Sequence, residues 1–302
     1  SPADDEQLLR LRCTEPLAPP ARDRRVAYSA RVQQQSPDWR PLPVQYADYS
    51  LWQRAALGRE ENPGSVMPAQ VEYWKQTLSG LPDAIDLPLD RPRPTDRALR
   101  GGTVRFTVPA EDHRTLLAFA RQHDSTMFMV MHAALAVLIA RLSGTGDVAM
   151  GTPIAGRGEE ALDDVVGMLV NTLVLRTAVD PAATFADVLS RVRESDLAAF
   201  GHADVPFESV VDAVAPNRST AYSPLFQILL EFQNTAPVHV DLPGLTVETV
   251  DVDPGVSKFD LQLTLTEQYD ATGTGAGIAA SFTFASDVFD RATVVRFGER
   301  FV

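Results

Sequence analysis

The stretch Lys258 to Leu265, KFDLQLTL, most constrains what this chain can fold into, because it alternates polar and apolar residues. Alternation with a period of two places the apolar set, from Phe259 to Leu265, on one face of a β-strand. Residues 278–284 are also rich in apolar residues and follow after a glycine-rich turn, Gly273 to Gly277. The two segments are therefore predicted to pair as an antiparallel hairpin.

The remaining apolar patterns predict helices and strands that alternate along the chain. Helices are expected at 46–57, 68–78, 110–123, 126–142, 185–200 and 290–302, with a shorter one at 26–32, and strands at 103–108, 148–154, 168–177 and 226–232. An antiparallel hairpin among such elements indicates a mixed sheet. The fold class predicted is α/β (α+β two-layer), with a mixed sheet flanked by helices.

Prolines interrupt this pattern between residues 82 and 95, where the text reads PDAIDLPLDRPRPT. Proline removes a backbone donor and disfavours regular structure, so an extended connection is expected. We place a lobe boundary in this connection, between residues 1–81 and 96–302.

Charge and composition exclude several classes of partner. The net charge of −13 would repel nucleic acid and anionic lipid, so neither is expected as a partner. The longest apolar run, Met127 to Leu142, falls short of the roughly 20 residues that cross a bilayer. The single cysteine, Cys13, has no disulfide partner, and the first residues lack the features of a signal peptide. We expect a cytoplasmic protein.

The common catalytic signatures do not occur in this sequence: it has no phosphate-binding glycine loop, no nucleophile elbow and no zinc-ligand spacing. The histidines, His113, His123, His132, His202 and His239, are scattered singly. His132 lies in the apolar run and is expected to form hydrogen bonds within the core. His113 and His123 flank charged residues and are expected on the solvent face of their helix.

The first of three more specific segments is Tyr46 to Trp52, YADYSLW. We interpret it as the start of a helix, with Asp48 in the first turn and the aromatic residues packed inward.

The second segment is Val166 to Arg176, VGMLVNTLVLR, an apolar strand that Asn171 and Thr172 interrupt. Buried polar groups need partners. Two alternatives stay open: Asn171 bonds neighbouring backbone at a bulge, or the polar pair faces a cavity.

The third segment is His202 to Glu208, HADVPFE, a loop between two helices. Asp204 or Pro206 is expected to start the second helix, and capping accounts for both residues. Capping does not account for His202, which we therefore consider for a role in a site or an interface.

In this order the three segments resemble core motifs of the condensation domains of nonribosomal peptide synthetases. YADYSLW is similar to Tyr-x-Asp-Phe/Tyr-x-x-Trp, VGMLVNT to Val-Gly-x-Phe-Val-Asn-Thr, and HADVPFE to His-Gln-Asp-Val-Pro-Phe-Glu. YWKQTLSGLP, GTPIAGR and SPLFQILLEFQN also resemble this family. The likeness covers about residues 26 to 302.

The resemblance implies two lobes of the chloramphenicol-acetyltransferase type, with 1–81 as the end of the first and 96–302 as the second. It implies peptide-bond formation between thioesters held on the phosphopantetheine arms of peptidyl and aminoacyl carrier domains, beside neighbouring synthetase domains, with no directly bound cofactor or metal. Candidates for the substrate tunnel or an interface are Asn171, Thr172, His202, Asp204 and Glu208. Tyr46, Asp48, Trp52 and Pro206 are assigned to structural motifs.

The family's catalytic His-His-x-x-x-Asp-Gly motif is missing, because the sequence contains no two adjacent histidines. Leu8 and Leu9 stand about where the histidines belong, and Cys13 and Thr14 where Asp-Gly belongs. None can replace them, since leucine carries no titratable proton and nothing nearby activates the thiol. Pro19 and Pro20 are expected to break the following helix.

Two accounts of this gap stay open. In the first, the chain is an excerpt of a condensation domain that lacks most of its N-terminal lobe, which the length of the sequence favours. In the second, it is a non-catalytic relative that docks carrier domains or recruits a tailoring enzyme. A stand-alone acyltransferase that uses coenzyme A ranks last, because it would need the same histidine. Arg, Ala and Asp usage with little Lys suggests a GC-rich bacterial source.

Overall fold

The computed structural model describes residues 18–58, 62, 64–156, 158–214, 219–233, 242–245, 247 and 252–302. These residues form two compact units. Among the described residues, unit 1 comprises 18–55, 155–156, 158–170, 242–245 and 247, and unit 2 comprises 56–58, 62, 64–154, 171–214, 219–233 and 252–302. The lobe boundary expected at residues 82–95 stays a prediction, and the residues from Leu8 to Thr14 lie outside the described ones.

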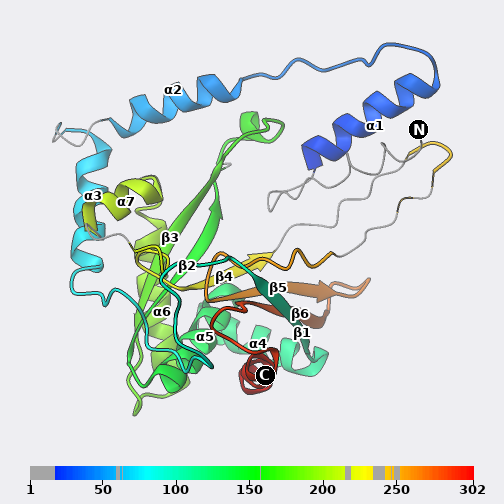
Figure 1. The fold of residues 1–302 in the computed structure, drawn as a ribbon. Helices are drawn as coiled ribbons and strands as arrows, with labels where there is room; N and C mark the ends of the chain where they lie inside the picture. Colours follow the sequence, from blue (N-terminus) through cyan, green and yellow to red (C-terminus); the bar gives the residue numbers. More distant parts are fainter. Residues whose placement is uncertain are drawn as a thin grey trace. The chain divides into compact units, whose positions relative to one another are not determined.

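The described part of the chain contains eight α-helices, a short 3-10 helix (Glu160–Leu162) and six strands (Figure 1). The helices are α1 (Ala18–Val32), α2 (Tyr46–Leu57), α3 (Val66–Thr77), α4 (Ala110–Gln122), α5 (Met127–Ser143), α6 (Phe185–Phe200), α7 (Phe207–Val214) and α8 (Arg291–Phe301). The strands are β1 (Gly101–Val108), β2 (Asp147–Ala155), β3 (Val170–Ala178), β4 (Ile228–Gln233), β5 (Leu261–Tyr269) and β6 (Gly275–Ala285).

The strands form one mixed sheet in the order β1-β6-β5-β4-β2-β3. β5 and β6 pair antiparallel, with Leu263 opposite Phe282, which confirms the hairpin predicted from the alternating pattern. β4 runs parallel to both β5 and β2. The predicted α/β class with a mixed sheet flanked by helices is therefore confirmed.

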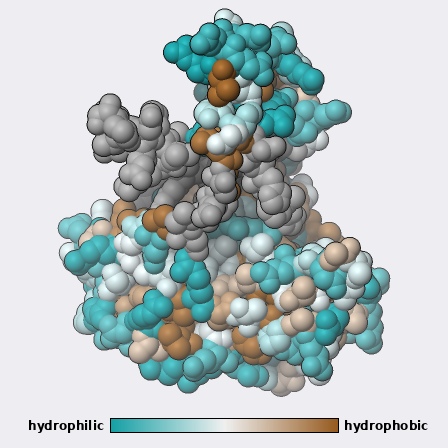
Figure 2. Space-filling view, turned by 90° about the vertical axis from the view of Figure 1, so that its right-hand side faces the viewer, coloured by the Kyte–Doolittle hydropathy of each residue, from teal (hydrophilic) through white to brown (hydrophobic). Residues whose placement is uncertain are grey.

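Alternation along β5 buries Leu261, Leu263 and Leu265 completely, while the residues between them are half-buried. The buried side joins the main hydrophobic core of unit 2 together with the apolar helix α5. On the part of unit 2 that Figure 2 shows, hydrophilic residues predominate and apolar ones are scattered.

Side-chain caps fix two of the helices of unit 2. Thr126 accepts a hydrogen bond from the backbone N–H of Met129 at the start of α5. Thr184 and Asp187 form a capping box at the start of α6, in which each side chain accepts from the other residue's backbone N–H. The Thr184 hydroxyl and the Thr184 backbone N–H both donate to the Asp187 carboxylate, and they hold the pKa of this carboxyl below its usual value.

The proline-rich connection, 82–95, contains no helix or strand, as predicted. Tertiary contacts hold it instead. Arg93 forms a bidentate pair with the buried carboxylate of Asp260, at 2.7 and 2.6 Å. The Gln227 side chain accepts from the backbone N–H of Ile85 at 2.9 Å and donates to the carbonyl of Asp83 at 3.2 Å. These bonds hold a connection that has no regular backbone ladder of its own.

His113 is buried completely, so its predicted position on the solvent face of α4 is wrong. The backbone N–H of Gly277 donates to its Nδ1 at 3.3 Å, so Nε2 carries the proton and donates to Glu267 at 2.9 Å. Tyr269 donates to the same oxygen at 2.8 Å. Burial of the Tyr269 phenol and the neighbouring Glu267 carboxylate raise the pKa of Tyr269 to about 12. The hairpin supplies every partner of this histidine.

His132 lies in the core as predicted and hydrogen-bonds to two other elements. Its Nδ1 is 2.9 Å from Asp196 on α6, and its Nε2 is 3.2 Å from the hydroxyl of Thr177 on β3. His132 and Asp196 are both fully buried. These bonds connect α5 to α6 and to β3.

The helix α1 begins at Ala18, so the prediction that Pro19 and Pro20 break it is wrong. Both prolines stand in the first turn, where the helix makes no use of their missing N–H groups. β3 also begins later than predicted, at Val170 rather than Met168. Met168 is 74% exposed and lies outside the strand.

No single helix among the described residues is long and apolar enough to cross a membrane. The pair Ala110–Gln122 and Met127–Ser143 meets the length and composition together but is bent by 104°.

We expect His113→Leu to lower the free energy of unfolding of the protein by about 2 to 4 kcal/mol, because it leaves Gly277 N–H and Glu267 without their buried partner. Urea denaturation would measure the loss. The control is His123→Ala at the end of α4, where the histidine is only half-buried and the expected loss is below about 1 kcal/mol. Equal losses in the two variants would contradict the buried hydrogen-bond role of His113.

Candidate functional site

The Asn171 side chain on β3 holds the loop 202–208 through its amide. Its Nδ2 donates to the carbonyls of Ala203 and Val205, at 2.9 and 2.8 Å. Its Oδ1 accepts from the backbone N–H groups of Thr172 and Phe207, at 2.9 and 3.0 Å. Four hydrogen bonds therefore satisfy the amide, and three of them reach the loop. Of the two alternatives for Asn171, the structure supports hydrogen bonding to backbone groups. These groups belong to the adjacent residue Thr172 and to the loop 202–208.

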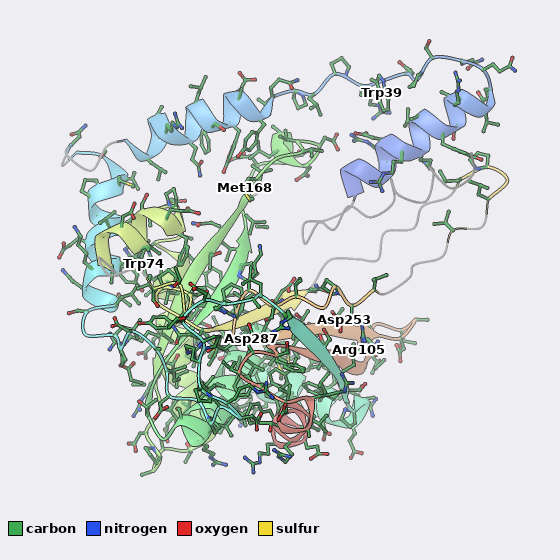
Figure 3. All side chains as sticks on the ribbon, viewed as in Figure 1. Trp39, Trp74, Arg105, Met168, Asp253 and Asp287 are labelled. Atoms are coloured by element: carbon green, nitrogen blue, oxygen red, sulfur yellow. The ribbon has the colours of Figure 1, made fainter. Side chains whose placement is uncertain are left out.

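Gln70 on α3 holds the same loop from a second element. Its Nε2 donates to the Asp204 carboxylate at 2.7 Å, and its Oε1 accepts from the backbone N–H groups of Asp204 and Val205, at 3.1 and 3.0 Å. The indole of Trp74, one turn further along α3, donates to the carbonyl of His202 at 2.9 Å. Figure 3 shows Trp74 on α3, the helix that packs against α7. Gln70 itself is only 5% exposed.

The His202 ring is fixed by one hydrogen bond and by stacking on one aromatic ring. Its Nδ1–H donates to the carbonyl of Ala198 at 2.8 Å, which leaves Nε2 as the acceptor atom. The ring stacks on Tyr73 with centroids 3.8 Å apart and planes 5° apart. Burial raises the pKa of the Tyr73 phenol. His202 therefore contributes to the packing between the loop and α3.

The loop ends where α7 begins, and Pro206 marks this point as predicted. Its carbonyl accepts from the backbone N–H groups of Ser209 and Val210, at 3.0 and 3.2 Å. Glu208 is exposed in the first turn, where the helix dipole favours a negative charge. Asp204 does not cap α7, because its carboxylate accepts from α3 instead.

The structure brings Asn171, His202, Asp204 and Pro206 together in unit 2, but their partners Gln70, Tyr73 and Trp74 were missed in the sequence. Gln70 stands among apolar residues of α3, and a polar residue at such a position was the available signal. Assignment of the five candidate residues to a substrate tunnel stays a prediction.

Tyr46 and Asp48 begin α2 in unit 1. The Tyr46 hydroxyl donates to the carbonyl of Met168 at 3.0 Å, and its ring covers Gly167, where a Cβ would come within 2.2 Å of the ring. Only glycine leaves room for this contact. The Asp48 carboxylate accepts from the backbone N–H of Gln45 at 2.9 Å, which fixes the first turn as predicted.

The aromatic residues of this helix do not all pack inward as predicted. Tyr49 is buried against Leu162, Val165 and Leu169. Trp52 is 58% exposed, because this small apolar cluster accommodates only Tyr49 from α2. Trp52 therefore lies on the surface of the described part of unit 1.

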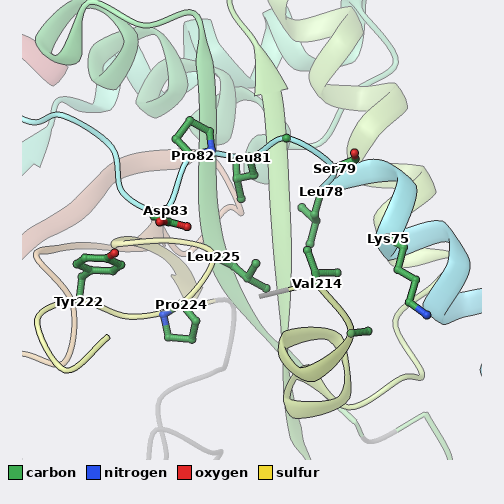
Figure 4. A pocket seen from close by; sticks show the side chains of 12 residues that line it. Lys75, Leu78, Ser79, Leu81, Pro82, Asp83, Val214, Tyr222, Pro224 and Leu225 are labelled. Atoms are coloured by element: carbon green, nitrogen blue, oxygen red, sulfur yellow. The ribbon is translucent and has the colours of Figure 1, made fainter. Parts of the chain in front are cut away.

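A separate cavity of about 310 Å³ lies at the C-terminal end of α3 (Figure 4). Its floor is apolar and includes the buried side chains of Leu78 and Leu225, and its rim carries Lys75, Asp83 and Tyr222. No residue of the loop 202–208 is among the described residues that line it. Within the described ranges, no cluster of three His, Cys, Asp or Glu side chains could hold a metal ion.

We expect Gln70→Leu to lower the free energy of unfolding by about 2 to 3 kcal/mol, because the backbone N–H groups of Asp204 and Val205 lose their acceptor. Amide hydrogen exchange would show loss of protection at these two residues. Gln76→Leu, on the exposed side of the same helix, is the control, with an expected change within about 0.5 kcal/mol. Unchanged protection in Gln70→Leu would contradict the clamp.

Comparison with known proteins places these features in a family. The family model for the condensation domain matches residues 21–302. A probable non-canonical nonribosomal peptide synthetase, CymA of Salinispora arenicola, is 47% identical over 276 residues, which are 91% of this chain and 4% of that protein. A dimodular nonribosomal peptide synthase of Bacillus subtilis is 43% identical over 284 residues, 94% of this chain and 12% of that protein. The chain thus spans a small part of these relatives.

Among solved structures, the X-domain in its complex with OxyB from teicoplanin biosynthesis is similar, with a TM-score of 0.87 at 30% identity. The likeness covers 94% of this chain and 62% of that one. The matched fold agrees with the condensation-type fold expected from the three sequence segments. The chain therefore belongs to the condensation-domain family of nonribosomal peptide synthetases.

Proposed function

We propose that this chain binds the peptidyl and aminoacyl carrier domains of a bacterial, cytoplasmic nonribosomal peptide synthetase through their phosphopantetheine arms. The family reaction is peptide-bond formation between two carrier-bound thioesters. The matched relatives support the synthetase context and its neighbouring domains. We further propose that these 302 residues do not form the peptide bond by themselves.

The observation that carries the second part of this proposal is the state of the histidines. The sequence has no adjacent pair of histidines. In the described part, His113 and His132 are buried and hydrogen-bonded inside the core, and His202 is stacked on Tyr73 with Nδ1 engaged. A general base must reach the proton that it removes. Both ring nitrogens of His113 and of His132 are engaged in structural hydrogen bonds, and His202 is held by Nδ1 and by stacking on Tyr73.

A docking role has support in the exposed apolar side chains of unit 1. Leu51, Trp52 and Met168 are each more than half exposed. Large aromatic and aliphatic side chains at the surface are typical of protein interfaces. Unit 1 therefore offers a surface on which a carrier or a neighbouring domain could pack.

We expect the chain to bind loaded donor and acceptor carriers but to give no peptide product above the uncatalysed rate. Mass spectrometry of the carriers would detect product, and calorimetry would detect binding. Addition of a polypeptide that carries the His-His-x-x-x-Asp-Gly motif should restore turnover if the missing pair is the cause. Product from the chain alone, abolished by His202→Ala, would overturn the proposal.

A second candidate function is recruitment of a tailoring enzyme to a carrier-bound peptide. The specific observation that favours it is the similarity to the X-domain, a protein solved in complex with OxyB. This role requires a surface rather than a catalytic histidine, so it is compatible with the same contacts.

For this second function we expect the chain to form a stable complex with OxyB in analytical size-exclusion chromatography. Leu51→Ser combined with Trp52→Ser should weaken the complex if unit 1 carries the contact, because burial of these side chains would be lost. Absence of any complex at micromolar concentrations would exclude OxyB itself as a partner.

A further inference from the structure

Glu231 on β4 is the centre of a polar cluster that lies outside the three family-like segments. The side-chain amide of Gln233 donates to its Oε1 at 3.0 Å. Gln262 and Thr264 on the neighbouring strand β5 donate to its Oε2, at 2.8 and 3.3 Å. Thr266 extends the cluster by donating to Gln233 at 3.3 Å. These side chains alternate along β5 with the leucines of the core, so they belong to the opposite face of the sheet.

Burial of Glu231 makes this cluster unusual. The residue is 9% exposed, and each of its three hydrogen bonds comes from a neutral amide or hydroxyl. No Lys, Arg or His forms a salt bridge with it among the residues that the structure describes. Its negative charge is therefore held away from water without a cation to neutralise it.

The other two buried carboxylates in the described ranges provide the comparison. Asp260 is paired with Arg93 at 2.6 Å, and Asp196 lies 2.9 Å from His132. Burial of a charge without a partner is costly, and proteins mostly avoid it by pairing. Asp260 follows this rule through Arg93, whereas Asp196 bonds His132 through Oδ1 alone and its Oδ2 has no hydrogen-bond partner among the described residues. Glu231 has neither an arginine nor a histidine partner in the same part of the chain.

One hydrogen-bonding position of the Glu231 carboxylate is unused among the described contacts. A carboxylate offers about four lone-pair positions, and the three bonds to Glu231 use one on Oε1 and two on Oε2. A second position on Oε1 stays available. A primary ammonium group supplies a positive charge, and one of its three N–H donors can use this position on Oε1.

We propose that Glu231 binds the protonated amino group of an aminoacyl ligand on the polar face of the sheet. This identification of the ligand rests on the proposed function, in which a carrier arm delivers an aminoacyl chain to the protein. The neighbouring amides and hydroxyls of Gln233, Gln262 and Thr264 orient the carboxylate. Glu231 is thus a binding residue that selects for a free amine over an acylated one.

The test uses the amide analogue of glycyl-pantetheine in two forms, with a free amino group and with an N-acetylated one. Isothermal titration at pH 7 should show that the protein binds the free amine about tenfold or more tightly than the acetylated form, as a charge-assisted hydrogen bond predicts. Glu231→Gln should bind the two forms equally. Glu299→Gln, which removes the same charge from the exposed face of α8, should keep the preference of the unmodified protein.

Two further probes separate this inference from the proposed function. If pantetheine alone binds but the two analogues bind equally, or if Glu231→Gln keeps the preference, the Glu231 site is overturned and the carrier role stands. If no pantetheine compound binds but glycinamide binds in a Glu231-dependent way, the carrier role fails and the site stands. Failure of every probe to bind overturns the site.

A folding control accompanies these measurements. The thermal midpoint of Glu231→Gln without ligand should be no lower than that of the unmodified protein, because the substitution removes a buried charge that has no cation. If Glu231→Gln does not fold, Glu231→Asp provides the second variant. It keeps the charge but withdraws the carboxylate, so it should weaken the preference for the free amine; an unchanged preference would contradict the proposal.

Discussion

The loop 202–208 depends on two side-chain amides that replace regular secondary structure. Backbone donors and acceptors in a partly buried loop must find partners, and here Asn171 and Gln70 supply most of them. An amide suits this position because it both donates and accepts, so one side chain can satisfy N–H and C=O groups together. The loop thereby joins β3, α3 and the start of α7 into one hydrogen-bonded assembly.

The sequence predicted this architecture where the signal was local. The alternation in KFDLQLTL indicated its strand, and the position of Asn171 in an apolar segment indicated that it needed partners. The sequence could not show which partners, because the loop that Asn171 bonds lies 32 to 36 residues further along the chain. Gln70 and Asp204 are 134 residues apart and meet only in the folded chain. His113 was misplaced for the same reason: its charged neighbours on α4 are visible locally, whereas Glu267 and Gly277 come from a distant hairpin.

The motifs that identify the family contribute mainly architecture in this chain. Asn171 clamps a loop, Pro206 starts a helix, Asp48 caps one, and the ring of Tyr46 packs over Gly167. Such residues are constrained by geometry, so they resemble the family even in a sequence that contains no catalytic histidine pair. Family membership and catalytic competence therefore rest on different residues, and the first does not establish the second.

The three buried carboxylates of the described residues, Asp196, Glu231 and Asp260, differ in the groups that they bond. Asp260 is paired with the guanidinium of Arg93, and Asp196 hydrogen-bonds to His132 through one of its two oxygens. Glu231 receives only neutral donors, which orient its oxygens without cancelling their charge. A fold selected for stability alone would gain from an apolar residue at this position. A carboxylate that is oriented by its neighbours but has no cationic partner is consistent with a binding site for a cationic ligand.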